Sequence, residues 1–398
     1  MRKNRYRDTI AVIIMSLLFL LLISFIHWKL QYPLLSPSAY NSYTLQAMAW
    51  RAGRADLGMN YPHLELAIFQ GRYFVSFPPV PSIPIYFLSF LFADQVPDGL
   101  LIKGYAFAAL IKLWYLFRRN GFSASSAACW AFMMCFASSM LPLLTSGAVW
   151  YQAQVLAFLL MIAAIASLDR GNITGSLILF ALAVGCRPPN VLFGPMIISI
   201  FAIRRHRAGE SLKTVSRRLM PGILIGMLIA VLYGMYNFHR FRNPFEFGHN
   251  YLPEFSFQGG TQFSLSHLGG NIAQYLFSLP FEQGAYGFQY KSFGFSFFLA
   301  NPILMLMIFW FIADMYKKRM MPEKWFLLIL MLSHLFFLLL HRTFGGFQYG
   351  ARYAVDLIPY AVLYLLYRKN KKPLCAEMLV LFLGLVMSVF GSLQFAIF

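Results

Sequence analysis

The stretch Thr9–Ile26, TIAVIIMSLLFLLLISFI, decides the class of fold. Its 18 residues carry no charge, and a run of that length crosses the hydrocarbon core of a bilayer as a helix. A cleaved secretory signal is the competing interpretation, because the basic segment MRKNRYR precedes the run. The run is too long for a signal, no small-residue cleavage site follows, and further apolar runs come later, so we expect a retained membrane helix. The positive-inside bias then predicts a cytoplasmic N-terminus.

The composition of the whole chain also favours a membrane protein. Of its 398 residues, 59% are hydrophobic and 12% are charged, whereas soluble domains have about half apolar and a quarter charged residues. A net charge of +19 would suit a nucleic-acid-binding protein. The cations instead gather at the ends of apolar runs, as in 204–218 and 368–372, where they face anionic lipid. We therefore expect membrane lipids as partners and no nucleic acid.

About a dozen apolar segments follow one another along the chain. They cover residues 9–29, 79–96, 99–117, 124–145, 149–168, 172–186, 189–204, 218–237, 293–315, 323–341, 352–367 and 374–396. Several are short or interrupted by proline, which is typical of half-helices that line a cavity. The sequence thus predicts an all-α polytopic membrane protein, a single domain over residues 1–398 with eleven or twelve transmembrane or partial helices.

The basic clusters do not fit a simple alternation of sides. If the basic clusters in the second half of the chain are all cytoplasmic, counting the membrane segments backwards places residues 94–99 on the external side. Residues 30–78 must also lie outside if the first helix crosses once. Either one segment between them fails to cross, or one basic cluster lies on the other side. Segment 79–96, with Pro79 and Pro81 at its start, is the best candidate for a re-entrant or partial helix.

Under this scheme the larger polar loops share the external face. They are residues 30–78, 238–292 and 342–352, and such loops are where a polytopic protein can place a site. In the first loop, a helical stripe from Tyr43 to Arg54 predicts a juxtamembrane helix. That helix could lie in the membrane interface or pack on the bundle as an ordinary amphipathic helix.

Few residues could act as a general base. The chain has only fourteen acidic residues, and those of the first loop are Asp56 and Glu65. Asp356 lies four residues after Arg352, a spacing that forms an ion pair on a helix, so it either caps that helix or supports a site.

Several catalytic motifs are missing from the sequence. The GxSxG and GxxxxGK[ST] patterns do not occur, which argues against a serine hydrolase and an ATP-driven motor. The loops also lack a DxD-like pair and HxxxH spacing. A metal is therefore not indicated, although a divalent ion stays possible.

Arginines on the same face are candidates for binding phosphate, because a guanidinium makes bidentate phosphate contacts. We single out Arg72, Arg187 and Arg352. Arg187 lies in CRPPN between two short apolar segments, which is a costly place for a charge unless it is paired or faces a polar cavity. Contact with lipid headgroups is the alternative interpretation for Arg240 and Arg242 on the same face, and less so for Arg187.

Four groups of residues in the same chain order resemble the membrane glycosyltransferases of the GT-C fold. Protein O-mannosyltransferases and lipid A aminoarabinose transferases are relatives of that kind, and uncharacterised bacterial members are the most similar. The matching residues are Leu64-Glu65-Leu66-Ala67 with Gly71-Arg72-Tyr73-Phe74 and Pro78–Pro81; Arg187-Pro188; Tyr236-Asn237 with Arg240-Phe241 and Asn243–Gly248; and Gly345-Gly346 with Tyr349–Tyr353, Asp356 and Pro359.

The resemblance implies a GT-C-like fold in the bacterial cytoplasmic membrane. It also implies transfer of a sugar from a polyprenyl-phosphate carrier to an acceptor at the external face. No other cofactor is implied, and the oligomeric state is open. The family's usual base is an aspartate early in the first external loop, but residues 36–41 contain no acid.

Roles follow from the resemblance and from the chemistry of transfer. Glu65 is then the expected base, with Asp56 as a second carboxylate. Arg72, Arg187 and Arg352 are expected to stabilise the departing phosphate, and Arg72 could instead orient Glu65. The supporting residues are Asp356, Tyr73 and Tyr349. Two alternatives stay open: a transporter or flippase for a lipid-linked substrate, and a non-catalytic membrane protein that has lost the base.

Overall fold

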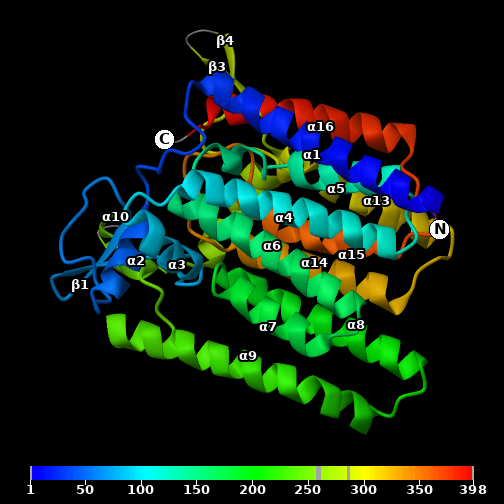
Figure 1. Cartoon of the computed structure of the whole chain (residues 1–398), viewed down its shortest axis with the longest axis horizontal. Coiled ribbons are helices and arrows are strands. Elements are labelled where there is room, and N and C mark those ends of the chain that lie inside the picture. Colours follow the sequence, from blue (N-terminus) through cyan, green and yellow to red (C-terminus); the bar gives the residue numbers. More distant parts are fainter. Residues whose placement is uncertain (1, 257–260, 285–286, 344, 397–398) are drawn as a thin grey trace. The chain divides into compact units, whose positions relative to one another are not determined.

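The structure, a computed structural model, describes residues 2–256, 261–284, 287–343 and 345–396. The chain divides into two compact units, and each is described by itself. Unit 1 consists of Met1–Pro33, Lys103–Thr145 and Leu265–Ile397. Unit 2 consists mainly of Leu34–Ile102 and Ser146–Ser264. Both are built largely from helices (Figure 1).

Six helices in the described part of the chain are long and apolar enough to cross a membrane. They are α1 (Arg2–Leu30), α4 (Asp98–Arg119), α6 (Val149–Asp169), α9 (Leu212–Phe241), α14 (Pro322–Leu339) and α16 (Cys375–Gln394). Side chains on α1 and α9 are largely exposed along their apolar lengths, as expected where lipid takes the place of water. The chain is therefore a helical integral membrane protein, as the sequence predicts.

Shorter helices occupy the remaining apolar segments. They are α3 (Ser82–Phe92), α5 (Ala124–Phe136), α7 (Ile173–Val184), α8 (Gly194–Arg207), α13 (Pro302–Tyr316) and α15 (Ile358–Leu366). With 11 residues, α3 is about 16 Å long, roughly half the thickness of the hydrocarbon core. By length it is a partial helix.

Unit 2 holds the first polar loop on a group of helices. In the loop, α2 (Ser42–Arg51) packs on α3, and β1 (Leu66–Phe69) pairs with β2 (Arg72–Val75). The helices α6, α7, α8 and α9 pack against one another, joined after α7 by the 3₁₀-helix η2 (Pro188–Phe193). After α9 come the 3₁₀-helix η3 (His249–Tyr251) and α10 (Pro253–Ser256).

Two details of the first loop correct the sequence analysis. The helix α2 ends at Arg51, so Arg54 lies beyond the predicted stripe, while Tyr43 and Ala47 are buried on it. The β1–β2 hairpin was not predicted at all. Its register pairs Leu66 with Val75 and Phe69 with Arg72, and the turn between them uses two residues with positive φ, as tight hairpins do.

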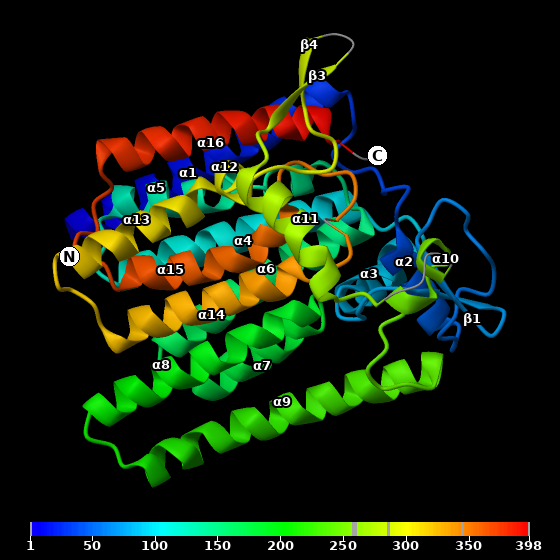
Figure 2. The same cartoon turned by 180° about the vertical axis from the view of Figure 1, so that it is seen from behind.

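Unit 1 contains α1, most of α4, α5, α13, α14, α15 and α16, with several short elements between them (Figure 2). The short elements are the 3₁₀-helices η1 (Pro142–Thr145) and η4 (Leu265–His267), α11 (Leu268–Ile272), a π-helix (Ala273–Phe277), β3 (Phe281–Gly284), β4 (Gly287–Tyr290), α12 (Phe297–Ala300) and the 3₁₀-helix η6 (Arg352–Leu357).

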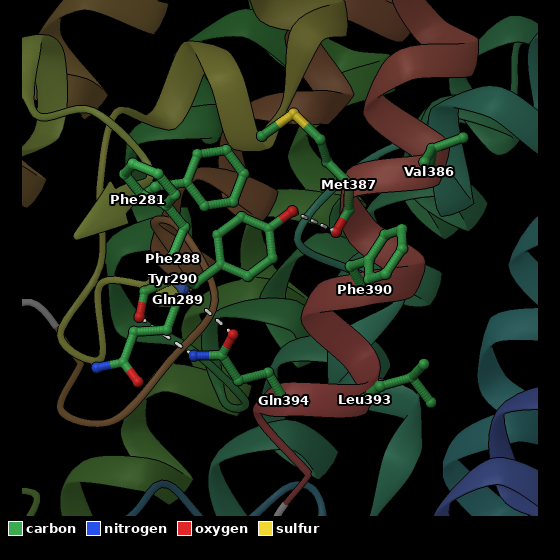
Figure 3. A pocket seen from close by; sticks show the side chains of 9 residues that line it. All are labelled: Phe281, Phe288, Gln289, Tyr290, Val386, Met387, Phe390, Leu393 and Gln394. Carbon is green, nitrogen blue, oxygen red and sulfur yellow. Dashed lines mark hydrogen bonds between the residues drawn. The ribbon is translucent and has the colours of Figure 1, made fainter. Parts of the chain in front are cut away.

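The β3–β4 hairpin is held on the end of α16. The amide of Gln394 accepts a hydrogen bond from Tyr290 N at 3.2 Å and donates one to Tyr290 O at 3.1 Å. The Tyr290 hydroxyl donates to the carbonyl of Met387 at 3.2 Å (Figure 3). Burial raises the pKa of Tyr290 to about 12, so this hydroxyl keeps its proton at neutral pH. Hairpin and helix together border a pocket of about 650 Å³ with a mainly aromatic and aliphatic lining.

Candidate functional site

A pocket of about 440 Å³ in unit 2 contains Glu65. Its lining combines two carboxylates, Glu65 and Glu254, with the imidazole of His63 and the rings of Tyr40 and Trp150. The volume lies toward the lower end of the range for small-molecule sites, which is about 300–1,000 Å³. Aromatic rings can stack on the apolar faces of a sugar, and carboxylates accept hydrogen bonds from hydroxyl groups.

The Glu65 side chain is held by a residue from a distant helix. Trp150 lies in the first turn of α6, and its indole Nε1 donates to Glu65 Oε2 at 2.8 Å. The backbone is held by the hairpin, since the Ser76 hydroxyl donates to Glu65 O at 3.0 Å. A hydrogen bond to a carboxylate is stronger than one between neutral groups, so the orientation of this carboxylate is well defined.

The aromatic wall of the pocket is also anchored to α6. Val149 N donates to Tyr40 O at 3.0 Å, and the ring centroids of Tyr40 and Trp150 are 5.2 Å apart. That separation is within the range of favourable aromatic pairs. Glu65 and its neighbouring rings are therefore fixed by the same end of one helix.

A buried carboxylate at the start of α4 supports this wall. Asp98, the first residue of α4, is 1% exposed, and its Oδ1 accepts a hydrogen bond from Ser38 N at 2.9 Å. The Ser38 hydroxyl in turn accepts from Tyr40 N at 3.2 Å. Asp98 thus holds segment 36–41, which carries no acid of its own. An acid at the start of an apolar helix is a common N-terminal signal, but it does not reveal this partner.

Asp56 and Arg72 form an ion pair with each other. Asp56 Oδ1 also accepts a hydrogen bond from Gly58 N at 2.9 Å, and the Arg54 guanidinium lies 3.9 Å from the same oxygen. The hairpin register places Arg72 opposite Phe69. The Cα atoms of Arg72 and Glu65 are therefore about 13 Å apart along the hairpin; Arg72 is paired with Asp56, and Trp150 donates to Glu65.

Tyr73 lies half-buried on the same hairpin, next to this ion pair. Its carbonyl accepts a hydrogen bond from Leu57 N at 2.8 Å, and its side chain packs on the buried cluster that includes Tyr43 and Val75. Together with the Asp56–Arg72 pair, this contact holds the hairpin against the rest of the loop.

Arg187 lies where α7 joins η2. Burial raises the pKa of the Tyr43 hydroxyl well above its usual range; Cys186 adds to the rise, and the charges of Arg187 and Arg240 oppose it. Arg187 therefore lies within electrostatic range of the buried face of α2. The proline-rich start of segment 79–96 contacts the same junction between α7 and η2, because Val80 N donates to Gly185 O at 3.1 Å.

The end of α9 binds the hairpin through Arg240, which is 2% exposed. Its Nη1 donates to Val75 O at 2.7 Å and its Nη2 to Asn237 Oδ1 at 2.8 Å. One helical turn earlier, the Tyr236 hydroxyl accepts from Gln46 at 3.0 Å. Sequence reasoning left lipid contact open for Arg240, whereas the structure makes it a buried link between α9 and β2.

Three of the expected site residues belong to unit 1. Arg352 is buried, and its Nε and Nη2 donate to Gly345 O at 3.1 and 2.7 Å. Asp356 is buried in the same 3₁₀-helix, and the ion pair expected between Arg352 and Asp356 stays a prediction. Tyr349 packs edge-on against Tyr290 at 5.3 Å.

Within the described ranges, no group of three His, Cys, Asp or Glu side chains is placed to hold a metal ion. A scan against protein-family models, a search of curated proteins and a search of solved structures each gave no match. What the structure defines is a helical membrane protein whose second unit carries a pocket with a fixed glutamate and an aromatic wall.

Proposed function

We propose that the protein is a membrane-embedded glycosyltransferase of the GT-C-like kind, moving a sugar from a polyprenyl-phosphate carrier to an acceptor at the external membrane face. The observation that supports the proposal best is the Glu65 carboxylate, oriented by Trp150 at 2.8 Å in an aromatic-walled pocket of about 440 Å³. Such a pocket suits a monosaccharide, and it belongs to a unit that also contains membrane helices.

In the proposed reaction Glu65 is the general base. It takes the proton of the acceptor hydroxyl as the acceptor oxygen bonds to the anomeric carbon. The bond from that carbon to the phosphate oxygen breaks, and the lipid phosphate leaves with the electron pair. The Trp150 indole keeps the carboxylate in one orientation, and the rings of Tyr40 and Trp150 stack on the sugar.

The leaving phosphate needs positive charge nearby. Within unit 2 we propose Arg187, as the resemblance implies and because its charge acts at the buried face of α2; Arg240 is bound to a strand carbonyl and Asn237. Arg72 is neutralised by Asp56, so both are assigned to holding the loop. Arg352 closes a turn in unit 1 through Gly345, and its expected role in phosphate binding stays a prediction.

The test compares strains that differ only in this protein. A deletion strain is complemented with the wild type, with Glu65→Gln, or with Glu282→Gln, a matched change on β3 of unit 1. Envelope glycans and lipid-linked sugars are then profiled by mass spectrometry, with protein levels measured in membranes. We expect Glu65→Gln to reproduce the deletion profile and Glu282→Gln to reproduce the wild type.

Two results would count against the enzyme. If Glu65→Gln restores the wild-type profile, Glu65 is not the base. If deletion changes no glycan or lipid-linked sugar, the transferase proposal is wrong for the conditions tested. A deletion strain that accumulates a lipid-linked sugar, and is corrected by Glu65→Gln, would instead support the transporter alternative.

A further inference from the structure

A long groove in unit 1 runs between α1, α5 and α16, three helices that lie side by side in Figure 1. Its volume is about 1030 Å³. One face of α1 lines it, including Ile14, Leu18 and Phe25, and Ala128 of α5 and Phe382 of α16 lie opposite. The larger of these side chains are well exposed, so the groove is an open apolar surface.

One end of the groove is positively charged. Arg7 and Asp8 of α1 and Arg118 of α4 line this end. Arg118 is engaged by Asp8 through two hydrogen bonds of 2.7 and 3.0 Å. Arg7 is exposed and has no ion-pair or hydrogen-bond partner in the part of the chain that the structure describes. The two cations and one acid leave a net charge of +1.

Ser123 and Ser125 also line the groove, and the Ser123 hydroxyl caps α5 by accepting a hydrogen bond from Ser126 N at 3.2 Å. An anion placed there would therefore meet Arg7 and hydroxyl donors together, and the apolar face begins immediately beyond them. A single positive end on a long apolar groove is complementary to an anionic headgroup with a hydrocarbon chain.

We propose that this groove, called the α1 groove from here on, binds one anionic phospholipid, with its phosphate at Arg7 and its acyl chain along α1. From Arg7 to Phe25 the groove extends about 27 Å at 1.5 Å per residue, which exceeds the thickness of one leaflet, about 15 Å. A complete acyl chain therefore fits along it. The proposal does not depend on the glycosyltransferase activity.

The charge at one end of the groove favours an anionic lipid over a second helix. Arg7 at that end calls for an anion, and an apolar transmembrane helix supplies none.

The test uses the full-length protein in detergent with a mixture of dioleoyl phosphatidylglycerol, which is anionic, and dioleoyl phosphatidylcholine, which is zwitterionic. Native mass spectrometry counts the lipids retained after extensive washing. Ala128→Trp fills the groove, and Leu228→Trp places the same side chain on the exposed face of α9. Arg7→Gln removes the cation, and Lys213→Gln removes an exposed cation at the start of α9.

We expect the wild type to retain one phosphatidylglycerol, Ala128→Trp to lose it, and Leu228→Trp to keep it. Arg7→Gln should lower the preference for phosphatidylglycerol about fivefold, the effect of one cation near a membrane surface, while Lys213→Gln leaves it unchanged. Retention by Ala128→Trp, or an unchanged preference in Arg7→Gln, would overturn the proposal. So would a dimeric wild type that Ala128→Trp converts to a monomer.

A second measurement needs no substitution, in case Ala128→Trp does not fold. Cys129 lines the groove and is partly buried, whereas Cys375 is exposed at the start of α16. Added phosphatidylglycerol should slow maleimide labelling of Cys129 several-fold and leave Cys375 unaffected, while phosphatidylcholine should protect less. Equal rates at Cys129 with and without phosphatidylglycerol would reject a lipid in this groove.

Discussion

Replacing Trp150 with phenylalanine should lower the free energy of unfolding, and the loss should be smaller when Glu65 is also replaced. The change keeps an aromatic ring beside Tyr40 but removes the indole N–H that donates to Glu65 Oε2 at 2.8 Å. Hydrogen bonds to charged groups contribute about 1.5–3 kcal/mol. Because both side chains are only partly buried, we take the lower end, about 1.5 kcal/mol, as the energy that couples them.

The measurement is a double-mutant cycle on the free energy of unfolding. Wild type, Trp150→Phe, Glu65→Met, which removes the acceptor oxygens, and the double variant are unfolded in mixed micelles by titration with SDS, followed by circular dichroism. We expect each single variant to be destabilised by about 1.5–2.5 kcal/mol. The double variant should be about 1.5 kcal/mol more stable than the sum of the single effects predicts.

A second cycle with Trp28→Phe is the control, because Trp28 is exposed on α1. The effects of Trp28→Phe and Glu65→Met on the free energy of unfolding should add. If the Trp150–Glu65 cycle is also additive within about 0.3 kcal/mol, the hydrogen bond does not hold the carboxylate and the account of the site fails. In a transfer assay, Trp150→Phe should lower the rate about tenfold, which is the same 1.5 kcal/mol applied to orientation.

Three further changes test the links around the site and the basic end of unit 1. Arg240→Met should destabilise the protein by about 1–3 kcal/mol in the SDS titration, because it leaves a buried strand carbonyl without its donor; a loss below 1 kcal/mol would contradict the assigned role. Gly185→Ala should lower the free energy of unfolding by about 1–3 kcal/mol, because its Cβ would clash with the Tyr233 hydroxyl. Gly226→Ala is the control: its Cβ meets nothing within 4 Å, so it should be neutral or stabilising. Burial and nearby cations lower the pKa of Lys371 to about 8. The unfolded chain therefore binds more protons than the folded chain between about pH 8 and 10.5, and stability should rise with pH in that range. Lys371→Met should flatten that rise in thermal unfolding, and an unchanged slope would exclude Lys371 as its source.

The membrane helices could be predicted because their signal is local. The run Thr9–Ile26 lies within α1, and each predicted apolar segment contains a helix. The β1–β2 hairpin could not be predicted from periodicity, because its strands have four residues each. Its one sequence signal was the Gln70-Gly71 pair, where both residues have positive φ and a tight turn requires that conformation.

The candidate site could be predicted only in part. Glu65 was identified because acids are scarce in this chain, but the group that orients it, Trp150, lies 85 residues away. Nothing in the sequence between them indicates that contact. The same holds for Arg240 and Val75, which are 165 residues apart, so burial rather than residue type decides whether an arginine of this chain faces lipid or holds the fold.

The residues that carry the resemblance to GT-C enzymes have different physical roles in the structure. Arg240 and Arg352 donate to backbone carbonyls, and Arg72 pairs with Asp56, so these cations hold loops and helix ends in place. A chain can keep these links after losing an activity. Whether the protein is an enzyme or a non-catalytic membrane protein therefore depends on Glu65, a charged motif residue that lines the pocket. The comparison of Glu65→Gln with Glu282→Gln tests that residue while leaving the structural links intact.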